Sequence, residues 1–481
     1  MMDELPSYWY SRLAFERALA FVYLIAFLGA TNQFIPLLGE RGLLPVPRFV
    51  RAIPFRASPS LFYLAPTDPA FRAAAWTGVA LACLALTGYV ERRGAASAAV
   101  WAGLWALYLS FVNVGQTFYG FGWESLLLEA GFLTIFAGAS VVAPSVLSIW
   151  MWRWVLFRIM LGAGLIKLRG DPCWRDLTCL DYYFETQPMP NQLSWYFHWL
   201  PASIHHAGVV FNHVAEIVVP FGYFAPQPIA AIAGLITIGF QLFLIVSGNL
   251  SWLNWLTIVL AIPTLDDRWL SWLPITPPPL QTAHAAHRIA IYALALAVVL
   301  MSVRPVLNML SPNQLMNASF NSLHLVNTYG AFGSITRNRN EIVIEGTTDS
   351  VLTERTIWRE YEFKGKPGNP SRLPPQIAPY HLRLDWLMWF AAMSSPNEQS
   401  WFTALLEKLL EGDPATLSLL KTNPFPIGPP RYVRARYYSY RFTTPEERRR
   451  TGRWWNRDPI GLYFPPVMIR PTGRDPEASL K

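Results

Sequence analysis

Long uncharged stretches fill most of the first 304 residues of the chain. A helix needs about 20 mostly apolar residues to cross a bilayer, so these stretches predict a polytopic α-helical bundle of eight or nine transmembrane helices. The predicted spans cover residues 18–38, 73–90, 95–123, 130–152 and 154–166, two or three spans within 217–265, and 289–303. A polar loop at residues 169–200 interrupts this bundle.

The pattern changes after Arg304. The segments EIVIEGTTDS, TIWREYEFKG and RYVRARYYSYRFT alternate apolar and polar residues, as half-buried strands do. The segments LRLDWLMWFAAM and WFTALLEKLLEG have helical spacing, and the second stops at Gly412 with Pro414 just beyond. We therefore expect a C-terminal α+β extramembrane domain at residues 305–470, followed by a frayed tail at 471–481.

Composition supports a membrane bundle joined to a polar domain. Apolar residues make up 52% of the chain and charged residues 15%, whereas soluble domains have about 25% charged residues. Basic residues are interleaved with acidic ones rather than forming a long run, which excludes a nucleic-acid partner. Arginine outnumbers lysine 33 to 6, which indicates a GC-rich genome and a bacterial source.

Charge alone leaves the orientation in the membrane undecided. The segment 39–72 carries five arginines, which favours the cytoplasmic side for this loop. Arg92 and Arg93 lie in the next loop, on the opposite side, and Arg12 and Arg17 near the N-terminus favour that same opposite side.

The polar loop contains the stretch GDPCWRDLTCLDYYFETQPMPN, residues 170–191. Cys173 and Cys179 either form a disulfide, if the loop faces an oxidising compartment, or remain as thiols; the spacing is not the C-x-x-C of redox enzymes. Charged side chains can form ion pairs and helix caps here, and prolines reduce the entropy lost when the loop orders. The candidate residues of this loop are Asp171, Trp174, Arg175, Asp176, Asp181 and Glu185.

Several ionisable residues lie within or beside apolar segments. They are Glu124, Glu129, Arg158, Lys167 and Glu216. Charges in a membrane are costly and usually face the bundle interior in pairs, so they form either interior salt bridges or a functional pocket. Lys167 is the candidate catalytic residue, because a desolvated lysine can act as a base.

No motif in the chain predicts a metal or a cofactor. His198, His205, His206 and His213 cluster after the loop, but they match no known ligand spacing. The sequence has no phosphate-cradling glycine loop and no G-x-S-x-G elbow.

Five stretches of the chain resemble the lipase maturation factor family. In family order they are FGWESLLLEAGFLTIF, RIMLGAGLIKLRGDPCWRDLTCLDYYFETQPMPN, LVNTYGAFGSITRNRNEIVIEGT, WREYEFKGKPGNPSRLPPQIAPYHLRLDWLMWFAA and NPFPIGPPRYVRARYYSYRFTT. The resemblance implies a multi-pass protein of the endoplasmic reticulum membrane, or of the inner membrane in a bacterium. It also implies a chaperone-like role, in which homodimeric secreted lipases are helped to an active state.

The resemblance further implies where a client and the membrane would meet the chain. A cytoplasmic N-terminus and nine spans would put the loop and the C-terminal domain on the exoplasmic side. That domain would engage a lipase-like client through exposed aromatic residues, for which the candidates are Tyr432, Tyr437, Tyr438, Tyr440, Trp454 and Trp455. The alternative is that half of these aromatic residues belong to the core of the domain. The sequence does not indicate an oligomeric state.

A more distant similarity suggests an alternative function. The segment LIKLRGDPCW is similar to a short motif in the membrane core of vitamin K-dependent carboxylases, in which a lysine acts as the base. This similarity implies a membrane enzyme that uses Lys167 with a quinone-like cofactor.

Overall fold

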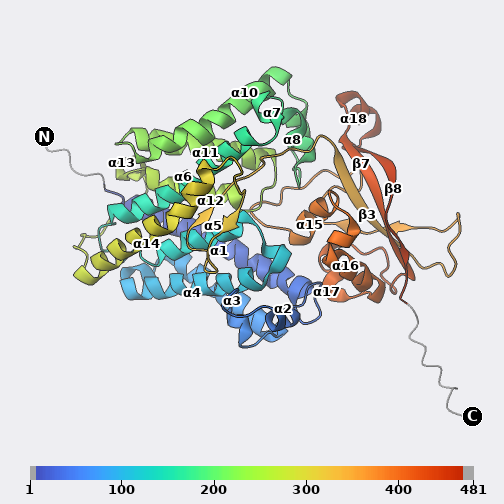
Figure 1. Cartoon of the computed structure of the whole chain (residues 1–481), viewed down its shortest axis with the longest axis horizontal. Helices are drawn as coiled ribbons and strands as arrows, with labels where there is room; N and C mark the ends of the chain where they lie inside the picture. The colour runs from blue at the N-terminus through green and yellow to red at the C-terminus, as the bar shows by residue number, and fades with distance from the viewer. Residues whose placement is uncertain (1–6, 470–481) are drawn as a thin grey trace, which may run out of the picture.

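The computed structural model describes residues 7–469, and the tail expected at 471–481 lies outside them. Within the described residues, seven helices are long and apolar enough to cross a membrane. They are α1 (Trp9–Leu38), α3 (Asp68–Thr87), α4 (Gly94–Val114), α6 (Val146–Arg169), α10 (Ala202–His213) with its continuation to Phe224, α11 (Ile229–Ser247) and α14 (Ala285–Leu310). The prediction of a polytopic helical bundle is confirmed (Figure 1).

Two shorter helices lie among the long ones. They are α5 (Gly122–Thr134) and α12 (Leu253–Ala261), the latter extended by a 3₁₀ turn, Ile262–Thr264. At 1.5 Å per residue α5 is only about 20 Å long, less than the hydrocarbon thickness of about 30 Å. Seven helices within residues 7–469 therefore qualify as spans by length and composition, and α5 and α12 are shorter than a span.

Several predicted segments have different bounds in the structure. Residues 130–152 and 154–166 are not two spans, because α5 ends at Thr134 and one helix, α6, covers Val146–Arg169. Gly138 in the connection has a left-handed φ of 87°, a conformation that glycine tolerates and a helix does not. The first helix begins at Trp9 rather than at residue 18, since carbonyl oxygens of Ala137, Ser140 and Val142 accept hydrogen bonds from Arg12.

The two ends of the bundle have different partners. At one end, the carboxylate of Asp267 accepts hydrogen bonds from the backbone N–H groups of Trp9 and Tyr10. At the other end, where α1 finishes, Gln33 contacts backbone groups of His381 and Arg383 in the C-terminal region. The start of α1 and the C-terminal sheet therefore lie at opposite ends of the bundle, as Figure 1 shows.

The C-terminal region contains a four-stranded antiparallel sheet in the order β4-β3-β7-β8. The strands are β3 (Arg339–Thr347), β4 (Arg359–Glu360), β7 (Tyr432–Phe442) and β8 (Trp455–Val467). Helices α15 (Arg383–Ala391) and α16 (Ser400–Glu411) pack on one face, and α16 ends at the left-handed Gly412. The segment TIWREYEFKG, expected to be one strand, forms only β4 and the two-residue β5 (Glu362–Phe363).

The described chain also contains short α-helices and strands. They are α2 (Val46–Ala52), α7 (Pro172–Arg175), α8 (Leu180–Thr186), α9 (Ser194–His198), α13 (Asp267–Leu270), β1 (Ala318–Ser319), β2 (Asn327–Thr328), α17 (Pro414–Leu417), β6 (Leu420–Thr422) and α18 (Pro445–Thr451). One hydrophobic core runs through both parts of the molecule. For example, Trp123 at the start of α5 packs edge-on against Trp386 of α15, with ring centroids 4.9 Å apart. The boundary drawn at residue 304 thus stays a prediction.

Candidate functional site

Lys167 is paired in the structure. Its Nζ lies 2.6 Å and 2.8 Å from the two carboxylate oxygens of Glu216, and it donates to Asn212 Oδ1 at 2.9 Å. The ring of Trp174 covers it at 4.8 Å from the centroid. Lys167, Glu216 and Asn212 are all buried. An ammonium held by a carboxylate and an amide oxygen stabilises α6 against α10, and this is the interior salt bridge that we considered for these residues.

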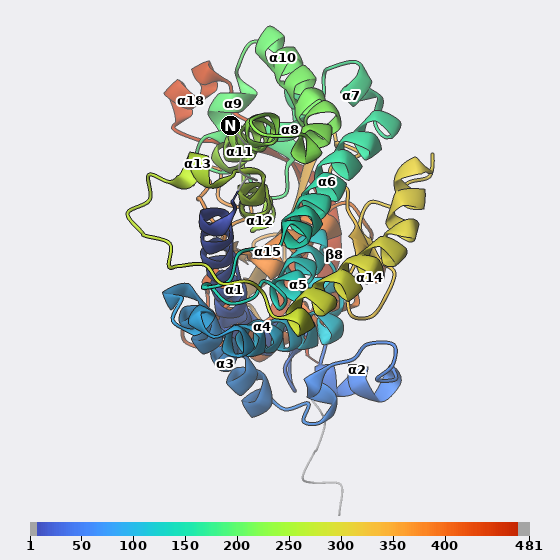
Figure 2. The same ribbon diagram turned by 90° about the vertical axis from the view of Figure 1, so that its left-hand side faces the viewer.

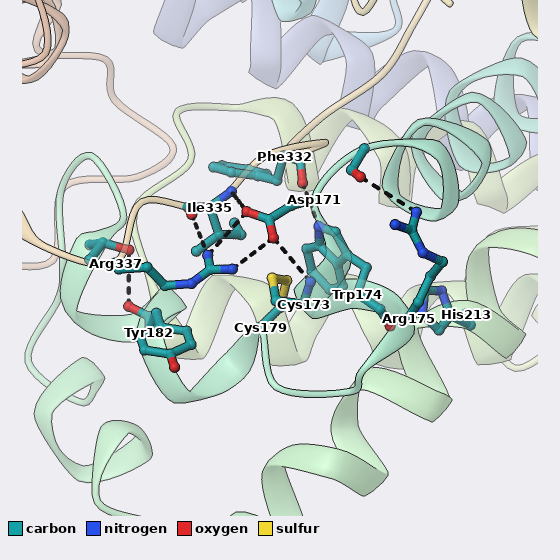
Figure 3. The surroundings of a disulfide bond; sticks show 12 residues. Asp171, Cys173, Trp174, Arg175, Cys179, Tyr182, His213, Phe332, Ile335 and Arg337 are labelled. Atoms are coloured by element: carbon teal, nitrogen blue, oxygen red, sulfur yellow. Dashed lines mark hydrogen bonds and ion pairs between the residues drawn. A yellow bond between two sulfur atoms is a disulfide. The ribbon is translucent and has the colours of Figure 1, made fainter. Parts of the chain in front are cut away.

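The polar loop begins with a capped turn that is tied to the C-terminal region (Figure 3). Asp171 caps α7 by accepting a hydrogen bond from the N–H of Cys173. Its carboxylate also accepts two hydrogen bonds, of 2.7 Å and 3.0 Å, from Arg337 and one from the N–H of Ile335. The hydrogen bonds from the Arg337 guanidinium lower the pKa of Asp171 to about 2. Asp171 is therefore a carboxylate at every physiological pH.

Cys173 and Cys179 are joined by a disulfide beneath this ion pair (Figure 3). Both cysteines are buried, in a small cluster with Trp174, Tyr183 and Phe184. The indole N–H of Trp174 donates to the carbonyl of Phe332 at 2.8 Å. The first turn of the loop thus packs on residues 332–337.

The remaining charged residues of the loop have separate environments. Arg175 is exposed and donates to the carbonyl of Leu168, and Asp176 is exposed. Asp181 lies 2.7 Å from His205 Nδ1. Glu185 is half-buried, its carboxylate accepts the N–H of Phe442 at 2.5 Å, and burial raises its pKa. The loop candidates are thus spread along the fold instead of converging on one point.

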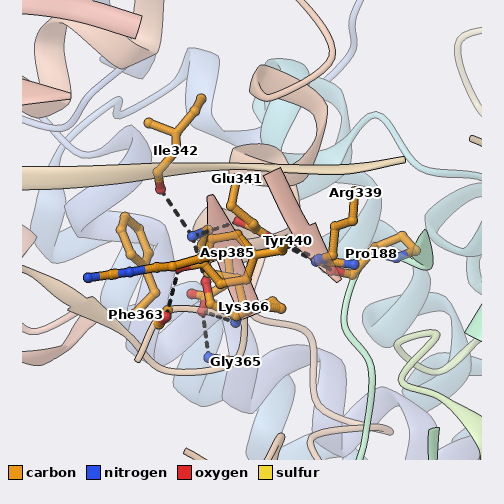
Figure 4. Close-up of polar contacts among 12 residues, drawn as sticks. Pro188, Arg339, Glu341, Ile342, Phe363, Gly365, Lys366, Asp385 and Tyr440 are labelled. Atoms are coloured by element: carbon orange, nitrogen blue, oxygen red, sulfur yellow. Dashed lines mark hydrogen bonds and ion pairs between the residues drawn. The ribbon is translucent and has the colours of Figure 1, made fainter. Parts of the chain in front are cut away.

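The end of the loop is held by Arg339, a residue that the sequence did not single out (Figure 4). The fully buried guanidinium of Arg339 donates to the carbonyls of Glu185, Gln187 and Pro188 and forms an ion pair with Glu341 at 2.6 Å. Three backbone acceptors and one carboxylate satisfy the planar donor fork of arginine. Strand β3 therefore fixes the backbone of residues 185–188.

A second buried cation, Lys366, extends this network. Lys366 Nζ lies 2.8 Å from Glu341 and donates to the carbonyls of Ile342 and Pro367. Asp385 of α15 accepts the N–H groups of Gly365 and Lys366, at 2.5 Å and 3.0 Å (Figure 4). Arg339 and Lys366 on Glu341 make the junction between loop and sheet rigid.

Glu124 and Glu129 also bind C-terminal residues. Arg383 of α15 donates to Glu124 at 2.6 Å, and Tyr108 donates to the same carboxylate. Glu129 pairs with Arg158. A second group of donors to Glu129 comes from residues after α14, namely the Tyr329 hydroxyl at 2.6 Å and both the N–H and the side-chain amide of Asn327.

The expectation of exposed aromatic anchors is wrong for four of the six residues. Tyr440 and Trp455 are 1% exposed, and Tyr438 and Trp454 are also buried, because the sheet face that carries them packs against Trp195 of α9 and the loop. Tyr432 and Tyr437 are half-buried. Only these two stay candidates for contact with a client.

The described residues contain no group of three or more His, Cys, Asp or Glu side chains that could hold a metal ion. Lys167 does not line either of two cavities, of about 580 Å³ and 390 Å³. The lining of the first includes Asn113 and His324, and the lining of the second includes Gln33 and Tyr380. The arrangement around Lys167 is that of a satisfied ion pair.

Comparison with known protein families shows the family to which this chain belongs. A family model described as "Lipase maturation factor transmembrane domain" matches residues 10–272, and one described as "Lipase maturation factor C-terminal domain" matches residues 325–465. The chain belongs to the lipase maturation factor family. The resemblance seen in the sequence is thereby confirmed.

Relatives in the family are similar over nearly their whole length. Lipase maturation factor 1 from Homo sapiens is 44% identical, with 98% of this chain and 90% of the relative covered. The Mus musculus protein of the same name is 41% identical over 96% and 88%. Lipase maturation factor 2 from Rattus norvegicus is 30% identical over 95% and 82%. No solved structure matches the chain.

Proposed function

We propose that this protein is a membrane-embedded maturation factor that helps a secreted lipase reach its active, assembled state. The observation that carries the proposal is the 44% identity to human lipase maturation factor 1 over 98% of the chain. Identity of this extent covers the bundle, the loop and the C-terminal sheet together. In a eukaryotic cell the protein would act in the endoplasmic reticulum membrane, and in a bacterium in the inner membrane.

The enzyme alternative is not favoured. The relatives described above are named lipase maturation factors. Lys167, the base that the alternative needs, has its ammonium bound by Glu216 and Asn212. Both partners belong to the protein itself, and the pair is buried.

The geometry suggests how a maturation factor of this kind would present itself to a client. The C-terminal sheet and the polar loop form one rigid unit at the end of the bundle away from the start of α1. Exposed apolar residues on this unit include Ile427, Ile460 and Leu462. The last two lie on β8, which pairs only with β7 in the described sheet. We infer that a client contacts this end of the molecule, with Tyr432 and Tyr437 as candidate contacts.

Rescue of lipase activity tests the proposal. The chain would be expressed in cells whose own lipase maturation factor 1 has been disrupted, together with a secreted homodimeric lipase. We expect lipase activity per amount of secreted lipase to rise, with the human relative as the positive control. The proposal fails if the chain reaches the same membrane in the same amount as the human relative and the lipase remains inactive.

A further inference from the structure

A basic surface lies beside the outer end of a transmembrane helix. Helix α18 and the residue after its C-cap carry Arg448, Arg449, Arg450 and Arg453, of which the last three are exposed. Tyr196 of α9 and Trp199 just after it are 52% and 40% exposed. These six residues are called the interfacial patch below.

The patch is held in place by α9. The indole N–H groups of Trp195 and Trp199 both donate to the carbonyl of Thr443, at 2.8 Å and 3.1 Å. The Arg448 guanidinium stacks on the ring of Trp454, 3.2 Å from its centroid, and Trp454 in turn contacts Tyr196. A capping box at Thr444 fixes the start of α18. The arginines therefore project from a rigid base.

Charge within α18 is only partly compensated. Glu447 binds Arg441 and Asn456, and Glu446 pairs with Arg449 in an exposed ion pair. Among residues 7–469, no carboxylate lies within salt-bridge distance of Arg450 or Arg453. Arg450 and Arg453 thus present positive charge without a counter-ion among residues 7–469, and Arg449 shares its charge with the exposed Glu446.

The position of the patch relates it to the membrane. The candidate span Ala202–Phe224 begins three residues after Trp199, and its outer face exposes Ile204, Phe211 and Val218. Figures 1 and 2 both place α18 on the same side of the molecule as α10, and Figure 2 shows α9 next to α18. Tyrosine and tryptophan at the end of a span are typical of the headgroup level. Arginines at that level meet phosphate oxygens, which their planar donors bind well.

We propose that the interfacial patch binds the phosphate groups of anionic phospholipids in the adjacent leaflet. The exposed arginines contact the headgroups, while Tyr196 and Trp199 lie between headgroups and acyl chains. This contact holds the C-terminal sheet against the membrane surface beside α10. The proposal is independent of the identity of the client.

Lipid selectivity of the full-length protein tests it. Protein purified in detergent would be mixed with equal amounts of phosphatidylglycerol and phosphatidylcholine, and the retained lipid measured by native mass spectrometry. The patch variant is Arg449→Gln/Arg450→Gln/Arg453→Gln. The matched control is Arg355→Gln/Arg359→Gln/Arg431→Gln, which neutralises three exposed arginines elsewhere in the C-terminal region.

We expect the wild type and the control to retain phosphatidylglycerol preferentially, and the patch variant to lose this preference by roughly tenfold or more. Soluble glycerol phosphate at the same concentration should not displace the lipid, since it lacks the chains that lie beside Tyr196 and Trp199. In nanodiscs, hydrogen exchange of residues 444–453 should slow when phosphatidylglycerol replaces part of the phosphatidylcholine.

Four outcomes would overturn the proposal. Equal preference in the patch variant and the wild type would remove the arginines from lipid binding. Equal loss of the phosphatidylglycerol preference in the patch variant and in the control would show that the lipid is attracted to the overall charge of the protein. Full displacement by glycerol phosphate would show a site for a free phosphate ester. If the patch variant kept its lipid preference but no longer bound an acidic partner protein, the patch would be a protein-binding surface instead.

Discussion

Lys167 and Glu216 form a buried ion pair across two transmembrane helices, with Nζ 2.6 Å from Glu216 Oε1. Glu216 lies in a π-helical segment, Val214–Val218, that continues α10. Such segments redirect side chains and often mark functional sites. Gly164 of α6 allows the approach, since a Cβ there would lie 3.0 Å from the Cβ of Glu216.

Replacement of Lys167 by methionine should destabilise the bundle. Glu216 would remain buried without its cation, and breaking a buried pair costs about 3–5 kcal/mol. We expect a lower thermal midpoint in detergent for Lys167→Met, a smaller decrease for Lys167→Arg, and recovery of much of the loss in Lys167→Met/Glu216→Leu. Lipase rescue should follow stability in all three variants. A well-folded but inactive Lys167→Arg protein would instead favour the enzyme alternative.

Loss of the Asp171 carboxylate should loosen the first turn of the loop. Asp171→Asn removes the ion pair with Arg337, which is 40% exposed in its side chain and so contributes no more than about 1 kcal/mol. Amide hydrogen exchange of residues 170–180 should accelerate in the variant and remain unchanged in Asp176→Asn, which alters an exposed acid of the same loop.

The pKa of Asp171 determines the pH range in which the ion pair with Arg337 stabilises the loop. Because the folded-state value, about 2, lies below the ordinary value of 3.8, the stabilisation is present above about pH 4 and disappears as the pH falls through 2. The difference in protection between wild type and Asp171→Asn should therefore be the same at pH 5.5 and pH 8. A difference that vanished at pH 5.5 would contradict the assigned ion pair.

Alkylation of the unfolded protein with and without reductant should show how many of the cysteines are free thiols. The chain has three cysteines, and Cys83 is a free, exposed thiol on α3. Protein unfolded without reductant should take up one alkyl group, and reduced protein three. Three groups without reductant would show that Cys173 and Cys179 are unpaired, and the loop would then lie in a reducing compartment. Closing so short a loop contributes roughly 2–3 kcal/mol, so reduction should also lower the thermal midpoint.

Arg339→Lys should weaken the junction between loop and sheet. Lysine keeps the charge near Glu341 but lacks the planar fork that holds three carbonyls, so buried acceptors lose their donors at about 1–3 kcal/mol. We expect faster proteolysis near residues 185–190 and a lower thermal midpoint. Arg355→Lys, the same exchange at an exposed position, should behave as the wild type. Equal behaviour of the two variants would contradict the role assigned to Arg339.

An odd number of membrane passes should place the N-terminus and the C-terminus on opposite sides of the membrane. The seven candidate spans within residues 7–469, an odd number, would put the C-terminal sheet on the side opposite the start of α1. With a cytoplasmic N-terminus, alkaline phosphatase fused after Lys481 should be active in a bacterial host, and green fluorescent protein fused at the same point should be dark. Fluorescence without phosphatase activity would reverse the topology.

The sequence predicted the elements whose pattern is local and missed those that depend on distant partners. Strand β7 and helix α16 follow from alternation and from helical spacing that ends at Gly412. Strand β8 was missed because Pro459, Gly461 and Pro465 interrupt its pattern. Proline is tolerated there because β8 pairs with one strand only in the described sheet.

In the candidate site, too, local features could be predicted from the sequence and contacts between distant residues could not. The capping role of Asp171 is local, since its acceptor position precedes a Pro-Cys turn, and a loop cap could be anticipated. Arg339 and Arg383 could not be paired with their partners, because 154 residues separate Arg339 from Glu185 and 259 separate Arg383 from Glu124. Burial of Tyr440 likewise depends on which sheet face the loop covers.

The ion pair between Arg383 and Glu124 can form only late in synthesis of the chain. Glu124 is synthesised early, and its cation is made 259 residues later. At roughly 5–20 residues per second, the ribosome needs about 13–50 seconds to cover that distance. Throughout this interval Glu124 lacks its cation, although Tyr108, which donates to the same carboxylate, has already been made. A chain halted before residue 383 would keep this buried acid without its cation.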